Sequence, residues 1–206
     1  APGLGEGIHS DAEPAPAPFG ALVGPAARGM RVDFSGIDRT RAEQCLTAAI
    51  YYEAASEPDG GQRAVAQVVL NRVAHKSYPN TVCGVVYQGI ERGWGCQFSF
   101  VCDGALLRTP APKLWREAHD IALAALGGFV ETSVGTATHY HADYVLPKWA
   151  FNLGKITQLG RHIFYRFHGN MGRPLAFNAR YSGTERVPMI NYAALANKAG
   201  TELALV

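Results

Sequence analysis

Apolar residues after position 40 recur with helical spacing. The first stripe comprises Ala42, Cys45, Leu46, Ala49 and Ile50. Thr40 and Glu43 have the spacing of a capping box, which predicts that the helix starts at Thr40. Pro58 predicts that this helix ends before it, because a proline disfavours helical conformation in the residue that precedes it.

A second helix is expected to begin at Asp59, as its N-cap, and to run to about Ala74. Apolar residues cover more than half of its circumference: Val65, Ala66, Val68, Val69, Leu70 and Val73. A helix that is apolar nearly all round belongs in the centre of a domain. We therefore expect it to pack against the first helix and to form the floor beneath that helix's C-terminal end.

Two further helices and a small β element are predicted beyond this pair. One helix is expected to begin at Pro79 with Ser77 as its cap, and another at Thr109-Pro110, ending at Gly127-Gly128. The segments TSVGTATHYHADY and RHIFYRF alternate as strands do. A short helix is expected near residues 192–198. The predicted architecture is a mainly helical α+β domain.

Composition and charge narrow the class of protein. The chain has 206 residues, enough for one domain with a real core, and its net charge of +2 argues against a dedicated nucleic-acid binder. No apolar run approaches 18 residues, so no membrane span is expected. Residues 1–30, rich in Pro, Ala and Gly, predict a flexible tether, and residues 31–206 the folded domain. Seven Lys or Arg against two acids between Tyr140 and Arg186 suit a polyanionic partner or a solvated basic face.

Four cysteines, an even number without a CxxC pair, lack zinc-ligand spacing. The chain begins at Ala1 without Met, which suits either cleavage of an export signal or a trimmed sequence, and export would allow disulfides. Cys96 and Cys102 flank a short segment and could be joined, leaving Cys45 with Cys83. Three pairings are possible, and a free thiol at Cys45 in the core is an alternative. We expect two disulfides and a periplasmic or secreted location.

One carboxylate interrupts the apolar stripe of the first helix. Glu53 stands three residues beyond Ile50 and four beyond Ala49, where the pattern requires an apolar side chain. Burial disfavours the charged form of a carboxyl and raises its pKa, and a protonated carboxyl in a cleft can act as a general acid. The alternative is a partly exposed glutamate on a frayed last turn, or one paired with an arginine.

The residues around Glu53 and three later motifs resemble the SleB/CwlJ family of cell-wall hydrolases. They are AIYYEAASEPDGGQRAVAQVVLNRV, YPNTVCGVVYQG, CQFSFVCDG and GRHIFYR, in the family's order, from about Gln44 to Arg166. The resemblance implies a lysozyme-like fold that cuts the glycan strands of peptidoglycan. It also implies that Glu53, in the E-A-x-x-E segment, is the catalytic glutamate. Peptidoglycan is then the expected partner of a monomer that needs no cofactor.

Four further residues are candidates for binding sugar. The family places Gln97 and Ser99 in a loop beside the cleft, and Tyr140 and Trp149 offer aromatic faces that can cover sugar rings. In the alternative, the polar pair faces solvent and Trp149 closes the core. Glu57 is expected to structure its loop by accepting hydrogen bonds from backbone amides, since Pro58 interrupts the helix.

Other chemistries compete with this one. His139, His141 and Asp143 alternate along a predicted strand and could bind zinc with His162 or His168, but no HExxH motif accompanies them, and we expect no metal. A cysteine nucleophile would need a free thiol, which the expected disulfides disfavour. A catalytically silent peptidoglycan-binding module that keeps the cleft is a third alternative.

A single well-placed acid is enough for a lytic transglycosylase, as lysozyme-like families with this activity imply, and such an enzyme would cut between N-acetylmuramic acid and N-acetylglucosamine. The substrate's own N-acetyl oxygen can stabilise the cationic sugar, and its own 6-hydroxyl can attack, giving a 1,6-anhydro end. A hydrolytic muramidase, the alternative enzyme, needs a positioned water and usually a second carboxylate.

Overall fold

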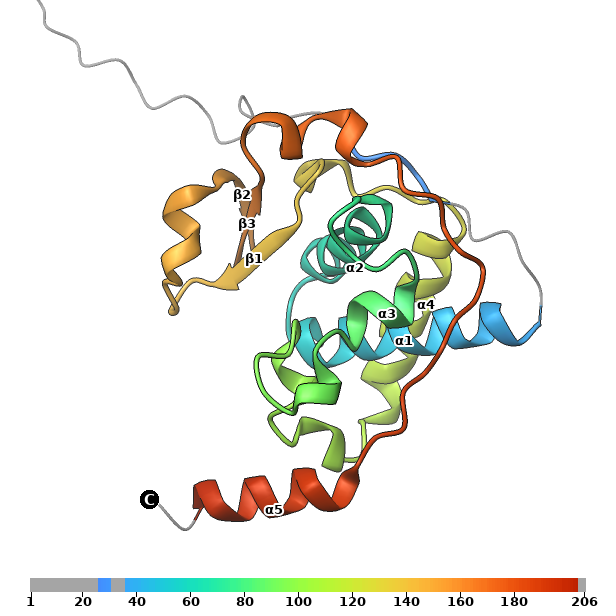
Figure 1. The fold of residues 1–206 in the computed structure, drawn as a ribbon, viewed down its shortest axis with the longest axis vertical. Helices are drawn as coiled ribbons and strands as arrows, with labels where there is room; N and C mark the ends of the chain where they lie inside the picture. Colours follow the sequence, from blue (N-terminus) through green and yellow to red (C-terminus); the bar gives the residue numbers. More distant parts are fainter. Residues whose placement is uncertain (1–25, 31–35, 204–206) are drawn as a thin grey trace, which may run out of the picture.

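The structure, a computed structural model, describes residues 26–30 and 36–203. Residues 1–25 of the predicted tether lie outside this part. Four helices pack together, with a small sheet beside one end of them and a fifth helix at the far end (Figure 1). The helices are α1 (Ile37–Ala54), α2 (Asp59–Ala74), α3 (Val82–Val86), α4 (Pro112–Leu126) and α5 (Tyr192–Leu203). None of them combines the length and apolarity that crossing a membrane requires.

Among the described residues, seven short 3-10 helices connect these elements. They are Ile90–Arg92, Ser99–Val101, Ala105–Leu107, Thr132–Val134, Lys148–Asn152, Gly169–Gly172 and Pro174–Ala176. The predicted fold class, mainly helical with a small β element, is confirmed.

Helix α1 begins earlier than the capping-box spacing predicts. Its N-cap is Gly36, and Thr40 lies inside the helix, where its hydroxyl donates to the Gly36 carbonyl at 3.3 Å. The Glu43 carboxylate pairs with Arg39 one turn earlier at 2.6 Å, so it does not cap the helix. The predicted end is confirmed, because the last helical residue is Ala54, ahead of Pro58.

Helix α2 is central, as predicted, and it ends at Ala74, as predicted. One of its faces packs into the helical core through Ala66, Val69 and Val73. The opposite face, with Ala64 and Val68, packs against the sheet. Asp59 is the first helical residue and Pro58 is the N-cap, so the prediction of Asp59 as the cap is wrong.

The starts of the next two helices also differ from the predictions. Helix α3 begins at Val82, and its cap is Thr81, whose hydroxyl accepts from the Gly84 N–H at 3.1 Å; Pro79 and Ser77 lie before it. Helix α4 begins at Pro112 instead of Thr109-Pro110, and it ends at Gly127 as predicted. Several residues in each of these stretches can begin a helix, so the local signal does not choose among them.

A buried carboxylate holds the C-terminal segment against α3. Glu185 is fully buried and accepts from the N–H groups of Val82 and Cys83 at 2.8 Å each, and from the Tyr181 hydroxyl at 2.6 Å. These bonds satisfy N–H groups at the start of α3 that have no partner within the helix.

The sheet has three antiparallel strands in the order β1-β3-β2. Strands β1 (His139–Ala142) and β3 (His162–Arg166) lie within the two segments predicted to be strands. Strand β2 (Gly154–Leu159) was not predicted, and an irregularity between Lys155 and Thr157 interrupts its alternation. The segment before β1 is fixed to α2 by Asn71, whose side-chain amide donates to the Gly135 and Ala137 carbonyls at 2.9 and 2.8 Å.

Both expected disulfides are present. Cys45–Cys83 joins α1 to α3, and Cys96–Cys102 closes the loop around the 3-10 helix Ser99–Val101. All four cysteines of the sequence are thereby paired, which removes the cysteine nucleophile.

The two disulfides should differ in what their removal changes. Cys45–Cys83 spans a sequence separation of 38 and Cys96–Cys102 one of 6. The chain-entropy account then gives a loss of about 4 kcal/mol for the first and about 2 kcal/mol for the second. Thermal melting of the two double Cys→Ala variants measures this difference. An equal loss, or a larger one for the short loop, would contradict it.

Candidate active site

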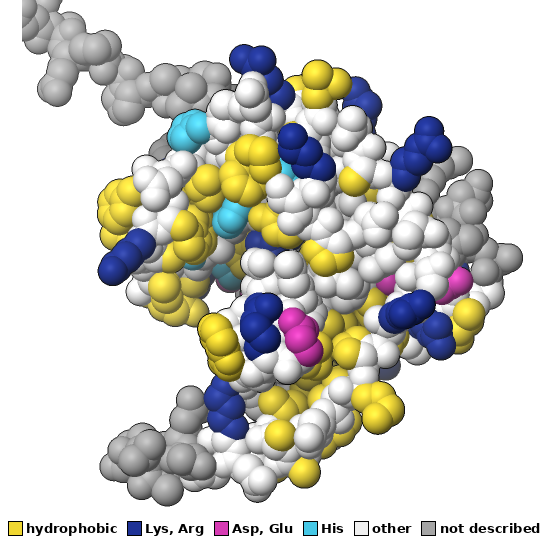
Figure 2. Space-filling model, viewed as in Figure 1, with side chains coloured by type: hydrophobic (Ala, Val, Ile, Leu, Met, Phe, Trp, Pro, Cys, Tyr) yellow, Lys and Arg dark blue, Asp and Glu magenta, His cyan; other side chains and the backbone are white. Residues whose placement is uncertain are grey.

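A pocket of about 220 Å³ lies where the helical core meets the sheet. It is lined by Glu53, Arg72, Gln97, Phe98, Ser99, His139, Tyr140 and Trp149. All five residues predicted for the site are therefore brought together, although they come from four separate parts of the chain. Figure 2 shows a hollow between the part that carries the sheet and the helical part below it, with histidine side chains near it.

Glu53 lies in the last turn of α1 and is partly buried. One of its oxygens, Oε2, accepts a hydrogen bond from the Tyr140 hydroxyl at 2.7 Å. Burial raises the pKa of Glu53, while the Tyr140 hydrogen bond and the charge of Arg72 oppose the rise and Asp103 adds to it. Within the described residues Glu53 makes no ion pair, so the alternative of a glutamate paired with arginine is wrong.

Tyr140 connects the sheet to Glu53. It lies on β1 opposite Phe164 of β3, and its ring packs against the rings of Phe164 and His162, with centroids 5.6 and 4.9 Å away. Burial raises the pKa of Tyr140 well above its ordinary value, so the hydroxyl stays protonated and donates to Glu53. Sequence reasoning proposed Tyr140 as a sugar-stacking residue and did not predict this bond to the acid.

Gln97 and Ser99 are held by the loop that the Cys96–Cys102 disulfide closes. Between them Phe98 is buried, and the next aromatic residue, Phe100, stacks on Tyr52 with ring centroids 4.9 Å apart. The aromatic side chains thus anchor the loop. Because buried and more exposed residues alternate along it, Ser99 is exposed and Gln97 is partly exposed. The pocket lining contains both polar residues.

Trp149 and His139 form the side of the pocket next to the sheet. Trp149 is partly exposed and lies beside His139, with ring centroids 5.2 Å apart. Burial, together with the charge of Arg72, lowers the pKa of His139 to about 4, so its imidazole is neutral at neutral pH. One ring nitrogen, Nδ1, lies 2.9 Å from the Thr138 hydroxyl oxygen.

The residues proposed for zinc have other partners. His141 Nε2 lies 2.9 Å from the Tyr165 hydroxyl, and Asp143 forms an ion pair with Arg161 at 2.9 Å. In the part of the chain that the structure describes, no three metal-binding side chains are grouped closely enough to hold an ion.

Glu57 accepts a hydrogen bond from a backbone amide, as predicted, but that amide lies in a distant turn and not in its own loop. Its Oε2 accepts from the backbone N–H of Arg161 at 2.8 Å, in the turn between β2 and β3. Gly160 precedes this N–H with φ of 55°, and a β-carbon there would collide with the Glu57 carboxylate. The carboxylate is therefore committed to this turn, and Glu57 is absent from the pocket lining.

Sequence reasoning missed Arg72 as a site residue. Arg72 comes from α2, is 3% exposed, and donates from Nε to the Thr138 carbonyl at 2.7 Å. The sequence does contain a signal for Arg72, because a charged residue stands there on a helix that is apolar over most of its circumference. Phe98 and His139 were considered only for packing and for zinc, respectively.

Comparison with known proteins identifies relatives of this chain. The sequence profile of the Cell Wall Hydrolase family matches residues 56–165, so Glu53 lies just before the matched span. The spore cortex-lytic enzyme of Bacillus cereus is 37% identical over 122 residues, covering 59% of this chain and 42% of that protein. The spore cortex-lytic enzyme of Bacillus subtilis is 31% identical over 119 residues, covering 58% and 35%. The matched region thus spans less than half of these relatives.

Two solved structures, each of a catalytic domain, are also similar to this chain. The catalytic domain of the Bacillus cereus SleB protein is 32% identical with a TM-score of 0.52, covering 67% of this chain and 96% of that one. The catalytic domain of the germination-specific lytic transglycosylase SleB from Bacillus anthracis is 33% identical with a TM-score of 0.51, covering 65% and 98%.

Proposed function

Because this chain belongs to the cell wall hydrolase family, we propose that it cleaves the glycan strands of peptidoglycan as a lytic transglycosylase, with Glu53 as its acid. One observation carries the proposal: Glu53 is the only carboxylate among the described residues that line the pocket, and burial raises its pKa. A relative named as a lytic transglycosylase supports the same reaction. The relatives' names also include cortex-lytic enzymes, which makes peptidoglycan the substrate class to test first.

The hydrogen bond from Tyr140 supports the choice of one Glu53 oxygen as the one that carries the proton. Since Oε2 accepts from the tyrosine hydroxyl, Oε1 is the oxygen left to carry the acidic proton. In the proposed first step, Oε1–H protonates the glycosidic oxygen and the bond from that oxygen to the anomeric carbon of N-acetylmuramic acid breaks. The N-acetyl oxygen of the same sugar stabilises the cation.

In the proposed second step, the 6-hydroxyl of the same sugar attacks its anomeric carbon, and Glu53, now a carboxylate, accepts the hydroxyl proton. The acid is thereby regenerated and the product is a 1,6-anhydro sugar. Intramolecular attack of this kind has a very high effective concentration, so it should outrun water. No second carboxylate lines the described pocket to activate a water on the opposite face of the sugar.

The paired cysteines support a location outside the cytoplasm, where disulfides persist. The pocket is stronger support for a glycan partner than the distribution of surface charge is. On the face that Figure 2 shows, the Lys and Arg side chains are spread singly, without one strongly basic patch. Peptidoglycan recognition is therefore proposed to rest on the pocket and its rim.

Product analysis distinguishes the three candidate functions. Purified peptidoglycan digested with the protein should yield 1,6-anhydromuramic ends, detected by mass spectrometry as products smaller by one water than reducing ends. Reducing muramic ends as the main product would assign a hydrolytic muramidase and overturn the transglycosylase proposal. Binding to peptidoglycan without any product would assign a silent binding module.

A further inference from the structure

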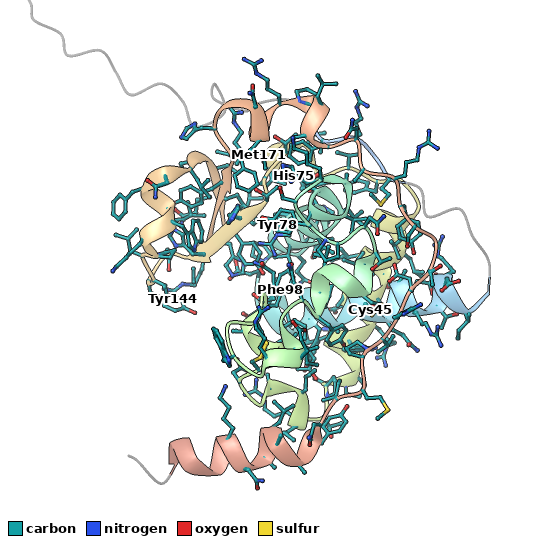
Figure 3. The ribbon with its side chains drawn as sticks, in the orientation of Figure 1. Cys45, His75, Tyr78, Phe98, Tyr144 and Met171 are labelled. Atoms are coloured by element: carbon teal, nitrogen blue, oxygen red, sulfur yellow. A yellow bond between two sulfur atoms is a disulfide. The ribbon has the colours of Figure 1, made fainter. Side chains whose placement is uncertain are left out.

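Arg72 is a buried cation in the wall of the proposed active-site pocket. Its guanidinium carbon lies 5.4 Å from the centroid of the Tyr78 ring and 5.1 Å from that of the Phe98 ring. Figure 3 shows Tyr78 and Phe98 close to each other in the region where the helical part faces the sheet. Together with the bond from Nε to the Thr138 carbonyl, these contacts fix the guanidinium in place.

The hydrogen bonding of this guanidinium is incomplete. An arginine side chain has five N–H donors. The Tyr78 side chain also hydrogen-bonds Arg72, and among the described residues the buried Nη1 has no partner. Several buried polar atoms lack partners, but Nη1 is the one that belongs to the lining of this pocket. Arg72 forms no ion pair within the described part of the chain. A buried cation with an unsatisfied donor is costly, and a ligand in this pocket can supply the missing acceptor.

Resting on the function proposed above, we propose that the terminal N–H groups of Arg72 bind the acetamido carbonyl oxygen of the N-acetylglucosamine that leaves when the strand is cut. Nη1 has the N–H groups without a partner, and Arg72 lines the pocket into which the sugar would bind. An acetamido group carries a methyl beside its carbonyl. Phe98, which contacts the guanidinium and also lines the pocket, offers the methyl an apolar surface.

A neutral carbonyl suits this position better than a carboxylate. The same guanidinium already binds an amide carbonyl through Nε. Arg72 and Glu53 lie close enough to interact electrostatically. A second carboxylate beside Glu53 would repel the carboxylate that forms when Glu53 gives up its proton. A carbonyl oxygen accepts the hydrogen bond without adding that repulsion.

The chemistry of the cleavage selects which sugar is bound. In the proposed reaction, the acetamido oxygen of N-acetylmuramic acid must offer its lone pair to the anomeric carbon. A guanidinium that donates to that oxygen would compete for the lone pair. The acetamido group of the neighbouring N-acetylglucosamine has no such task, so Arg72 can hold it and place the leaving oxygen at Glu53.

The test compares intact strands with strands whose N-acetylglucosamine units carry an amino group in place of the acetamido group. Glycan strands are used either intact or after treatment with a deacetylase specific for N-acetylglucosamine units, and kcat/KM is measured for each. Hydrogen bonds to charged groups contribute enough for removal of the acetyl group to lower the wild-type value by roughly ten- to a hundred-fold. Arg72→Lys and Arg72→Met should cleave intact strands more slowly and discriminate little between the substrates. Arg63→Lys, a matched control on the same helix outside the pocket lining, should discriminate as wild type does.

Each outcome decides one of the two proposals. Wild-type protein that cleaves both substrates equally well would overturn the role of Arg72, and this arm requires no variant to fold. Equal discrimination by wild type and a folded Arg72→Lys variant would overturn it as well. Failure of the wild type to cleave either substrate would overturn the proposed function itself.

Discussion

Glu53→Gln is expected to fold normally and to lose nearly all lytic activity. Glutamine keeps the shape of the side chain and its oxygen can still accept from Tyr140, but it has no acidic proton for the glycosidic oxygen. Positioned acid–base catalysis contributes roughly 10²–10⁴-fold, so the rate of release of soluble fragments from peptidoglycan should fall by that factor. The measurement is the initial rate of release at equal protein concentration.

Stability provides a second readout for the same variant. A carboxyl whose pKa is raised in the folded state binds its proton more tightly there than in the unfolded chain. The free energy of unfolding therefore falls as pH rises from the unfolded-state pKa through the folded-state pKa. Glutamine does not ionise, and the variant should melt no lower than wild type at neutral pH. A variant that is inactive because it is unfolded would fail this test.

Glu57→Gln is the matched control, since it makes the same chemical change four residues along the chain. The Glu57 carboxylate binds the turn at Arg161 and is outside the pocket lining, so a modest loss is expected. Near-wild-type activity in folded Glu53→Gln would remove the proposed acid. If Glu57→Gln were equally damaging, and reducing ends predominated, Glu57 would instead be the second carboxylate of a muramidase.

The position of Glu53 could be predicted because it depends on local periodicity. A stripe that includes Ile50 and Ala49 continues onto Glu53, and the same stripe packs against α2 in the structure. The C-terminal end of α1 follows from Pro58 for the same local reason. The predicted start of α1 was wrong, because the helix begins one turn before Thr40, after Gly36. Asp38 in this extra turn accepts from the N–H of Glu185, a distant residue, at 2.8 Å.

The partners of Glu53 depend on contacts between distant segments, and no periodicity encodes these. Tyr140 reaches the acid because β1 pairs with β3 and the segment before β1 is fixed to Asn71 of α2. The prediction of sugar stacking treated Tyr140 as an aromatic face and left out its hydroxyl. Arg72 joins the pocket through the Thr138 carbonyl, a contact between residues 66 positions apart.

Tyr140→Phe is expected to lower activity and to move its pH dependence upward. The hydroxyl holds Glu53 Oε2, so its loss lets the carboxyl rotate away from the position for proton transfer, and kcat should fall by about ten- to a hundred-fold. The hydrogen bond also favours the ionised form and lowers the pKa of Glu53, so its removal lets burial raise that pKa further. Because a general acid works in its protonated form, the decline of activity at high pH should begin at a higher pH than in wild type.

A pH profile separates this positioning role from sugar stacking. Phenylalanine keeps the aromatic face, so a residue that only stacked on sugar would retain both kcat and the wild-type profile after the change. The control is Tyr165→Phe. Tyr165 lies on β3 outside the pocket lining, its hydroxyl pairs with His141 of β1, and its removal should leave the pH profile unchanged. A Tyr140→Phe variant with an unchanged high-pH limb and unchanged kcat would show that the bond to Glu53 does not act in the reaction.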